Sequence, residues 1–269
     1  MIGQKKLKSC IETFIAADAL PQFMIFVGPK GCGKKTFVSE MFKGIYIEDN
    51  KVESVRKLID LAYKVKDEVF IIPDADDMSV NAKNALLKVV EECPNGNRFI
   101  MTLQDRENTL PTILSRACVL DMDRYSSDEL LEYCWSLGTE GAITNDYEVV
   151  ADVCSTPGDA ELFLQYGVKP FVDYVKLVLD NIGTVDPANA FKSSSKLAIK
   201  NDEGYDLRLF FLVFCFACID YFVEGKEDQN YVKAIQVTSK YIPKLEKLGV
   251  NRQQLYDRWV FDVREALWI

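Results

Sequence analysis

The sequence of 269 residues contains no histidine. Enzymes that use an imidazole as acid or base, the Ser-His-Asp hydrolases among them, are therefore excluded. Cysteine occurs eight times, but only Cys215 and Cys218 form a C-x-x-C pair, and they lie inside an apolar segment. Because a zinc site of this type needs a second pair or histidines, we expect these thiols to pack in a core and the chain to bind no metal.

Long apolar runs are also absent. The longest, Leu209–Ile219, is far shorter than the roughly 20 residues that a membrane-spanning helix needs, and we expect it to form a helix buried on all sides. The opening stretch MIGQKKLKSC is not followed by the apolar segment of a secretory signal. We therefore expect a cytoplasmic protein with reduced cysteines and no membrane partner.

Positive charge is in deficit, since the net charge is −9 and the isoelectric point is about 4.8. A protein that grips nucleic acid through its phosphates usually presents a basic face. The acidic balance disfavours a chain that binds DNA by itself. It favours a subunit that contacts other proteins.

Apolar runs and helical periods alternate along the first half of the chain. Phe23–Val27 and Val69–Ile72 are continuous apolar runs, which are typical of parallel strands buried on both faces. The alternation predicts an α/β layer with a mainly parallel sheet over residues 1–123. The other expected strands are residues 44–47, 98–103 and 118–122, and the expected helices are residues 7–15, a short one from about Thr36, residues 52–65 and residues 79–92.

The pattern changes after Asp123. Ser126 and Glu129 have the spacing of a capping box, in which a hydroxyl and a carboxylate satisfy each other's free backbone N–H groups at a helix start. Only helical patterns follow. We expect a small helical unit over residues 124–168 and a larger helical domain over residues 169–269.

A glycine-rich segment, GPKGCGKKT, follows the first buried strand and matches G-x-x-x-x-G-K at Gly28, Gly33 and Lys34. In such a loop the backbone N–H groups and the lysine bind phosphates, and the hydroxyl after the lysine binds magnesium. Here Lys35 stands in the place of that hydroxyl, and an ammonium only donates hydrogen bonds. Thr36 comes one residue late, turned about 100° around the helix.

The second half of such a site is an apolar strand that ends in two acidic residues, which orient magnesium and activate the attacking water. Here the strand at Val69–Ile72 is followed by Pro73, which has no carboxylate. Two interpretations stay open for the carboxylates that come next, a polar cap of the loop or a weak residual metal role. These carboxylates belong to Asp74, Asp76 and Asp77.

The glycine loop and the segment VFIIPDADDMSVNAKNALLKVVEECPNGNRFIMTLQDRENTLPTILSRA resemble AAA+ clamp-loader subunits, and among them the delta-prime subunit of bacterial DNA polymerase III. The resemblance is dense from Ile2 to about Met122 and weaker beyond. It implies a RecA-like α/β AAA+ module of the P-loop NTPase type over residues 1–123. A small helical lid over 124–168 and an all-α collar over 169–269 would follow.

This resemblance also implies a function. Delta-prime is a rigid, non-hydrolysing stator in a hetero-pentamer of clamp-loader subunits, which sets the sliding clamp on primed DNA, so contact with DNA is indirect. Ser115 and Arg116 match the family's Ser-Arg pair, whose arginine enters the ATP site of the neighbouring subunit. The alternative for Arg116 is an ordinary surface arginine before an edge strand. No cofactor is required, and ATP or ADP with weak or no magnesium is the residual ligand that we expect. The residual nucleotide-binding residues are Gly28, Gly31, Gly33, Lys34, Lys35 and Thr36.

The chain departs from the active members of this family at several positions. Pro73 and Asp74 replace an Asp-Glu pair. Gly158 stands where active members have a lid arginine, and residues 125–207 contain no arginine. The four-cysteine zinc module of many relatives is missing, because residues 36–69 contain no cysteine, and we expect no zinc.

Two further pairs of residues have alternative interpretations. Gln104 and Asp105 match the family's polar sensor, but a plain loop after a strand explains them equally well. Ile2 and Gly3 lie where the family contacts adenine, and because the chain begins abruptly we expect that pocket to be incomplete.

Two other functions also stay open. An active ATP-hydrolysing clamp-loader subunit would have to bind magnesium through Thr36 and Asp74. A P-loop kinase of small molecules would need lid arginines, and the arginine-free stretch 126–207 disfavours it.

Overall fold

The chain folds into two compact units, Met1–Tyr125 and Ser126–Ile269. The computed structural model describes residues 2–138, 144–184, 196–197, 204–223, 229–245 and 249–268. The first unit ends at Tyr125, slightly beyond the predicted limit at residue 123. The division of the helical part into a lid over 124–168 and a collar over 169–269 stays a prediction.

A five-stranded sheet with the strand order β2-β3-β4-β1-β5 forms the centre of the first unit. Every paired strand is parallel to its neighbour, so the predicted parallel sheet is confirmed. All of β1 is buried, as expected for a strand covered on both faces. The strands are β1 (Phe23–Val27), β2 (Ile45–Tyr46), β3 (Val69–Ile72), β4 (Arg98–Leu103) and β5 (Cys118–Asp121).

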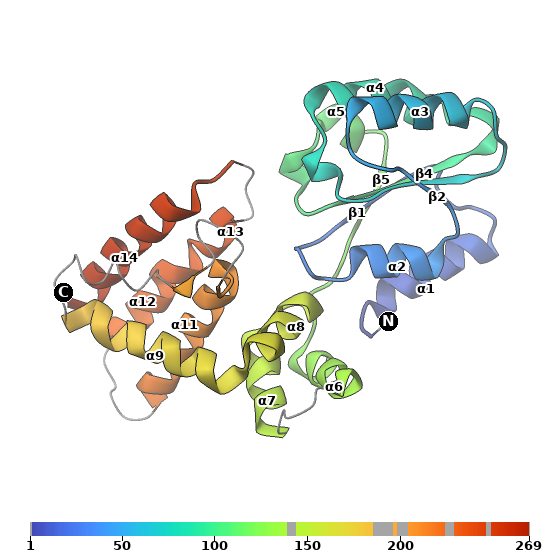
Figure 1. Ribbon diagram of the computed structural model, residues 1–269. Coiled ribbons are helices and arrows are strands. Elements are labelled where there is room, and N and C mark those ends of the chain that lie inside the picture. The colour runs from blue at the N-terminus through green and yellow to red at the C-terminus, as the bar shows by residue number, and fades with distance from the viewer. Residues whose placement is uncertain are drawn as a thin grey trace. The chain divides into compact units, whose positions relative to one another are not determined.

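Helices cover both faces of this sheet (Figure 1). α3, α4 and α5 lie over one face, and α1 and α2 over the other. The helix α2 begins at Lys34, earlier than the predicted Thr36, because Gly33 adopts a left-handed conformation (φ 85°) and caps the helix. The short α5 was not predicted, since it is a single turn opened by a proline. The helices are α1 (Lys5–Ala16), α2 (Lys34–Met41), α3 (Val52–Ala62), α4 (Val80–Glu92) and α5 (Pro111–Leu114).

One apolar core of this unit lies between the sheet and the helices α3 and α4. Phe70 and Phe99, on the neighbouring strands β3 and β4, stack with their ring centroids 5.3 Å apart. Leu58 of α3 and Leu86 of α4 are buried in the same cluster. This core holds β1, β3 and β4 rigidly, and the loops at their carboxyl ends share one edge of the sheet.

The second unit is helical, and its first helix begins with the predicted capping box of Ser126 and Glu129. Its centre is Trp259, which is fully buried and whose Nε1 donates a hydrogen bond of 3.0 Å to Oγ1 of Thr238. The described helices are α6 (Ser127–Leu137), α7 (Thr144–Val153), α8 (Pro157–Tyr166), α9 (Val168–Thr184), α11 (Leu207–Val223), α12 (Gln229–Ser239), α13 (Ile242–Leu245) and α14 (Arg252–Trp268).

The apolar helix α11 is buried along most of its length, but the prediction that it is buried on all sides is wrong. Ile219 is 50% exposed, because the helix packs only its other faces against the core. An unbroken apolar run has no periodicity, so it does not indicate which face of a helix is exposed. Cys218 is fully buried and Cys215 half-buried, and burial raises the pKa of Cys215 to about 12. These thiols therefore pack rather than react. None of the described helices is long and apolar enough to cross a membrane.

Candidate functional site

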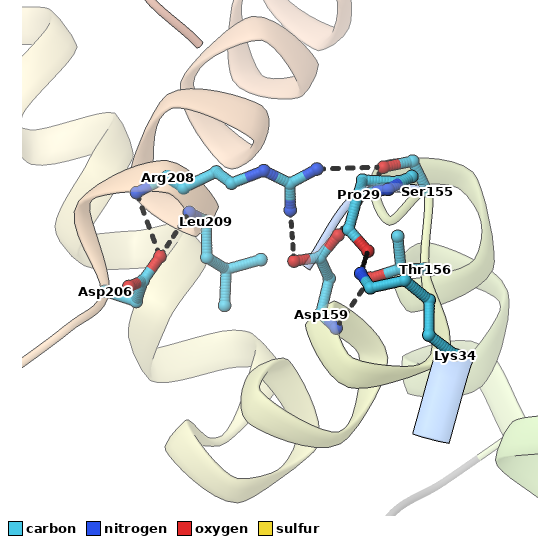
Figure 2. A network of polar contacts seen from close by, with 8 residues as sticks. All are labelled: Pro29, Lys34, Ser155, Thr156, Asp159, Asp206, Arg208 and Leu209. Carbon is cyan, nitrogen blue, oxygen red and sulfur yellow. Dashed lines mark hydrogen bonds and ion pairs between the residues drawn. The ribbon is translucent and has the colours of Figure 1, made fainter. Parts of the chain in front are cut away.

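The glycine loop connects β1 to α2 at the carboxyl edge of the sheet. Gly31 and Gly33 have φ angles of 81° and 85°, which residues with a side chain rarely adopt. These two glycines turn the backbone into the helix. Lys34 is only 5% exposed, and its Nζ donates hydrogen bonds to the carbonyl oxygens of Gly28 (2.7 Å) and Pro29 (2.9 Å; the latter is drawn in Figure 2). The ammonium thus lies inside the loop, beside the backbone that would cradle a phosphate.

The start of the chain packs against this loop. Gly3 lies so close to the ring of Tyr125 that an added Cβ would come within 2.5 Å of it, and the hydroxyl of Tyr125 donates to the carbonyl of Cys32 (3.0 Å). Gln4 is 4% exposed and makes paired hydrogen bonds with the backbone of Asp123. Burial raises the pKa of the Cys32 thiol in spite of the nearby Lys34, which disfavours the reactive thiolate.

Lys35 forms an ion pair with Asp74. The distance from Nζ of Lys35 to Oδ2 of Asp74 is 2.5 Å, and the two side chains are 61% and 35% exposed. The two residues occupy the positions at which a P-loop NTPase has its magnesium-binding hydroxyl and its second acidic residue. Lys35 and Asp74, which the sequence showed as two separate departures from the motif, thus contact each other in the structure.

The backbone of Asp74 is held on both sides. Its N–H donates to Oγ1 of the fully buried Thr102 (2.9 Å), and its carbonyl accepts from Nδ2 of Asn50 (2.8 Å). Asp74 has a φ of 48°, a left-handed conformation that is uncommon outside glycine and enriched in aspartate. Thr102 and Asn50 were not found from the sequence, because only the sheet brings them beside Asp74.

The neighbouring Asp76 has a structural role. It is 2% exposed and accepts hydrogen bonds from the backbone N–H groups of Gln104 and Asp105 and from Nδ2 of Asn108. For Asp76, the loop-cap interpretation is therefore confirmed. The side chain of Asp105 accepts from the N–H of Glu107 and caps a short helical turn, and the sensor role of Gln104 and Asp105 stays a prediction.

The residues at this edge of the sheet do not fit a magnesium ion. The hydroxyl position carries an ammonium, Pro73 has no carboxylate, and Asp74 is already paired with Lys35. Thr36 is exposed on α2, and among the described residues it forms no hydrogen bond with Asp74. The part of the chain that the structure describes also contains no cluster of carboxylates or thiols that could hold a metal elsewhere.

Arg116 follows α5 on the surface of the first unit. Its Nε donates to Oε2 of Glu91 (3.2 Å), and its Nη1 donates to the carbonyl of Thr112 (2.9 Å). The side chain is 35% exposed. Ser115 is also exposed, and its hydroxyl donates a hydrogen bond to the carbonyl of Thr112 at the end of α5. The guanidinium is thus oriented by its own chain through Nε and Nη1.

A protein-family model described as "DNA polymerase III, delta subunit" matches residues 43–126. DNA polymerase III subunit gamma of Buchnera aphidicola is 28% identical over 131 residues, which are 44% of this chain and 36% of that protein. The replication factor C small subunit of Halobacterium salinarum is 25% identical over 178 residues, 59% of this chain and 55% of that protein. The resemblance to AAA+ clamp-loader subunits is confirmed.

The solved structures agree with this fold. A single-residue variant of RuvB from Thermotoga maritima superimposes with a TM-score of 0.51 and 19% identity, over 95% of this chain and 85% of that one. This likeness confirms the AAA+ fold, a RecA-like module followed by helices. The chain spans between about a third and about half of the length of the two clamp-loader relatives.

Gly158 is the residue that the resemblance matches with the lid arginine of active clamp-loader subunits. Gly158 lies in the first turn of α8, next to Asp159, which forms an ion pair with Arg208 of α11 (Figure 2). Nη2 of Arg208 also donates to Oγ of Ser155 (3.2 Å), and the N–H of Asp159 donates to Oγ1 of Thr156 (3.2 Å). The arginine nearest to this turn in the second unit is therefore engaged within that unit.

Proposed function

We propose that this chain is a clamp-loader subunit of the delta-prime type, a stator that does not hydrolyse ATP and that supplies Arg116 to the ATP site of a neighbouring subunit. Its partners are the other subunits of a hetero-pentamer and the sliding clamp, with primed DNA contacted indirectly in the cytoplasm. No cofactor is required for this role.

The contrast between the two functional positions carries the proposal. The magnesium position is filled by the Lys35–Asp74 pair, whereas Arg116 lies at the surface with its guanidinium already oriented by Glu91. Glu91 and Thr112 thus hold the guanidinium at the surface, accessible to a neighbouring subunit, while nothing comparable is arranged for a magnesium ion beside Lys34. A guanidinium supplied in trans stabilises the charge on the transferred phosphoryl group.

The isolated chain is expected to show no ATP hydrolysis above background. Without a metal ligand next to Lys34 and with Pro73 after β3, neither magnesium nor the attacking water is held. Phosphate release from the purified chain, measured beside the Lys34→Ala variant, checks this. Robust turnover that Lys34→Ala abolishes would instead support an active clamp-loader ATPase.

Glu91 is expected to act as a positioning residue for Arg116. Replacing it with alanine should lower the kcat of the reconstituted assembly severalfold with little change in KM, because the guanidinium loses one of its two fixed contacts. Glu91→Gln should restore most of the rate, since its amide oxygen can still accept from Nε.

The next residue of the helix supplies a matched control for this test. Glu92 is also on α4 but pairs with Lys88 rather than Arg116. Glu92→Ala should leave assembly turnover unchanged. Equal losses from Glu91→Ala and Glu92→Ala would mean that α4 matters only for its overall charge.

A further inference from the structure

The Lys35–Asp74 pair stands where the fold places a divalent cation. The ammonium carries a positive charge at the carboxyl edge of β3, at the start of α2, with its tip 2.5 Å from the carboxylate. Lys35 is more than half exposed, so the ammonium can reach a ligand in the loop without leaving a packed core. The ammonium of Lys35 thus has the charge sign and the position of the missing ion, but not its coordination chemistry, and Asp74 offsets part of its charge.

The backbone of Asp74, which pairs with this ammonium, is fixed by hydrogen bonds. Its N–H is bonded to Thr102 and its carbonyl to Asn50, and its φ of 48° is kept by these two contacts. These contacts fix the backbone from which the carboxylate projects, and the ion pair with Lys35 sets the direction of the carboxylate itself. A second, mobile cation would have to displace Lys35 from a partner that is already oriented.

Lys34 and Lys35 place two positive charges at the loop, where both can offset the negative charge of bound phosphates. Lys34 is buried in the loop and donates to the carbonyl oxygens of Gly28 and Pro29, beside the backbone that faces phosphates in this motif. Lys35 lies further out, on the side of Asp74. Two ammonium groups at one loop attract the phosphates of a nucleotide with no need for a metal.

We propose that the tethered ammonium of Lys35 takes the place of magnesium in this loop, so that the chain binds a nucleoside diphosphate or triphosphate without a divalent cation and does not hydrolyse it. The non-hydrolysing part of this statement rests on the proposed function. The metal-independent binding does not, because it concerns the isolated chain and involves neither Arg116 nor a neighbouring subunit.

The test is equilibrium binding of a fluorescent ADP and a fluorescent ATP analogue to the purified full chain, in excess magnesium and in excess EDTA. The wild-type dissociation constant should agree between the two conditions within about twofold. Lys35→Ala should weaken binding about tenfold or more in EDTA, the loss of one charge-assisted hydrogen bond to a phosphate. Lys43→Ala, an exposed lysine beyond the other end of α2, removes the same charge and should leave binding unchanged.

A gain-of-metal variant completes the design. Lys35→Thr combined with Pro73→Asp restores the hydroxyl and the first carboxylate, and binding should then tighten when magnesium is added. Circular dichroism checks that each variant is folded. Wild-type binding that magnesium tightens about tenfold, no saturable binding in either condition, or Lys35→Ala binding as tightly as the wild type would each overturn the proposal.

Discussion

In an assembly reconstituted with the Arg116→Ala chain, ATP turnover at the neighbouring site is expected to fall about 10³-fold or more, the contribution of an arginine finger supplied in trans. The loss arises because the guanidinium stabilises charge that develops only in the transition state. Arg116→Lys should recover only a part of the rate, since a lysine keeps the charge but not the planar fork of donors.

The experiment must isolate one site of the pentamer. Every active subunit except the one whose site Arg116 completes therefore carries a substitution of its own loop lysine, so that steady-state phosphate release reports only that site. Arg106→Ala is the matched control, because Arg106 is another arginine on the surface of the same unit, 51% exposed against 35% for Arg116, and it pairs with Asp121. Assembly itself should be unchanged on gel filtration, because an exposed ion pair contributes little stability. Full turnover with Arg116→Ala would reject the finger.

The second large effect is expected on stability. Arg208→Ala should lower the free energy of unfolding of the second unit by about 3–5 kcal/mol, because it leaves the carboxylate of Asp159 buried without its partner. The two side chains are only 15% and 10% exposed, and they join α11 to the first turn of α8. Combining Arg208→Met with Asp159→Asn removes both charges and should recover most of the loss.

Tryptophan fluorescence can follow this unfolding selectively. All three tryptophans, Trp135, Trp259 and Trp268, belong to the second unit, so a urea titration followed by their emission reports that unit alone. The control is Lys176→Ala, whose ion pair with Asp220 is more exposed (27% and 34%) and should contribute about 1 kcal/mol or less. Equal shifts of the midpoint for both variants would contradict a special role of the buried pair.

Much of the first unit was predictable because its signals are local. A strand covered on both faces needs an unbroken apolar run, and β1 and β3 were found with their observed limits for this reason. The capping box of Ser126 and Glu129 was equally clear, since its two partners are three residues apart. The one-turn helix α5 and the exposed position of Ile219 were missed, because neither leaves a periodic pattern.

The candidate site was predictable in its residues but not in its contacts. Lys35, Pro73 and Arg116 could be recognised from the motifs alone. Thr102, Asn50 and Glu91, which hold Asp74 and Arg116 in place, could not, since ordinary polar residues in a strand, a loop and a helix carry no signal of their own.

By itself, the sequence determined which chemical groups this protein possesses: an ammonium in place of a hydroxyl, a proline in place of a carboxylate, and an arginine after a short proline-led turn. Only the tertiary structure decided that Lys35 meets Asp74. β1 and β3 are not neighbours in the sheet but flank β4, and the parallel order brings the loops after both strands to the same edge. An ion pair depends on the distance between its charges in space, which separation along the chain does not specify.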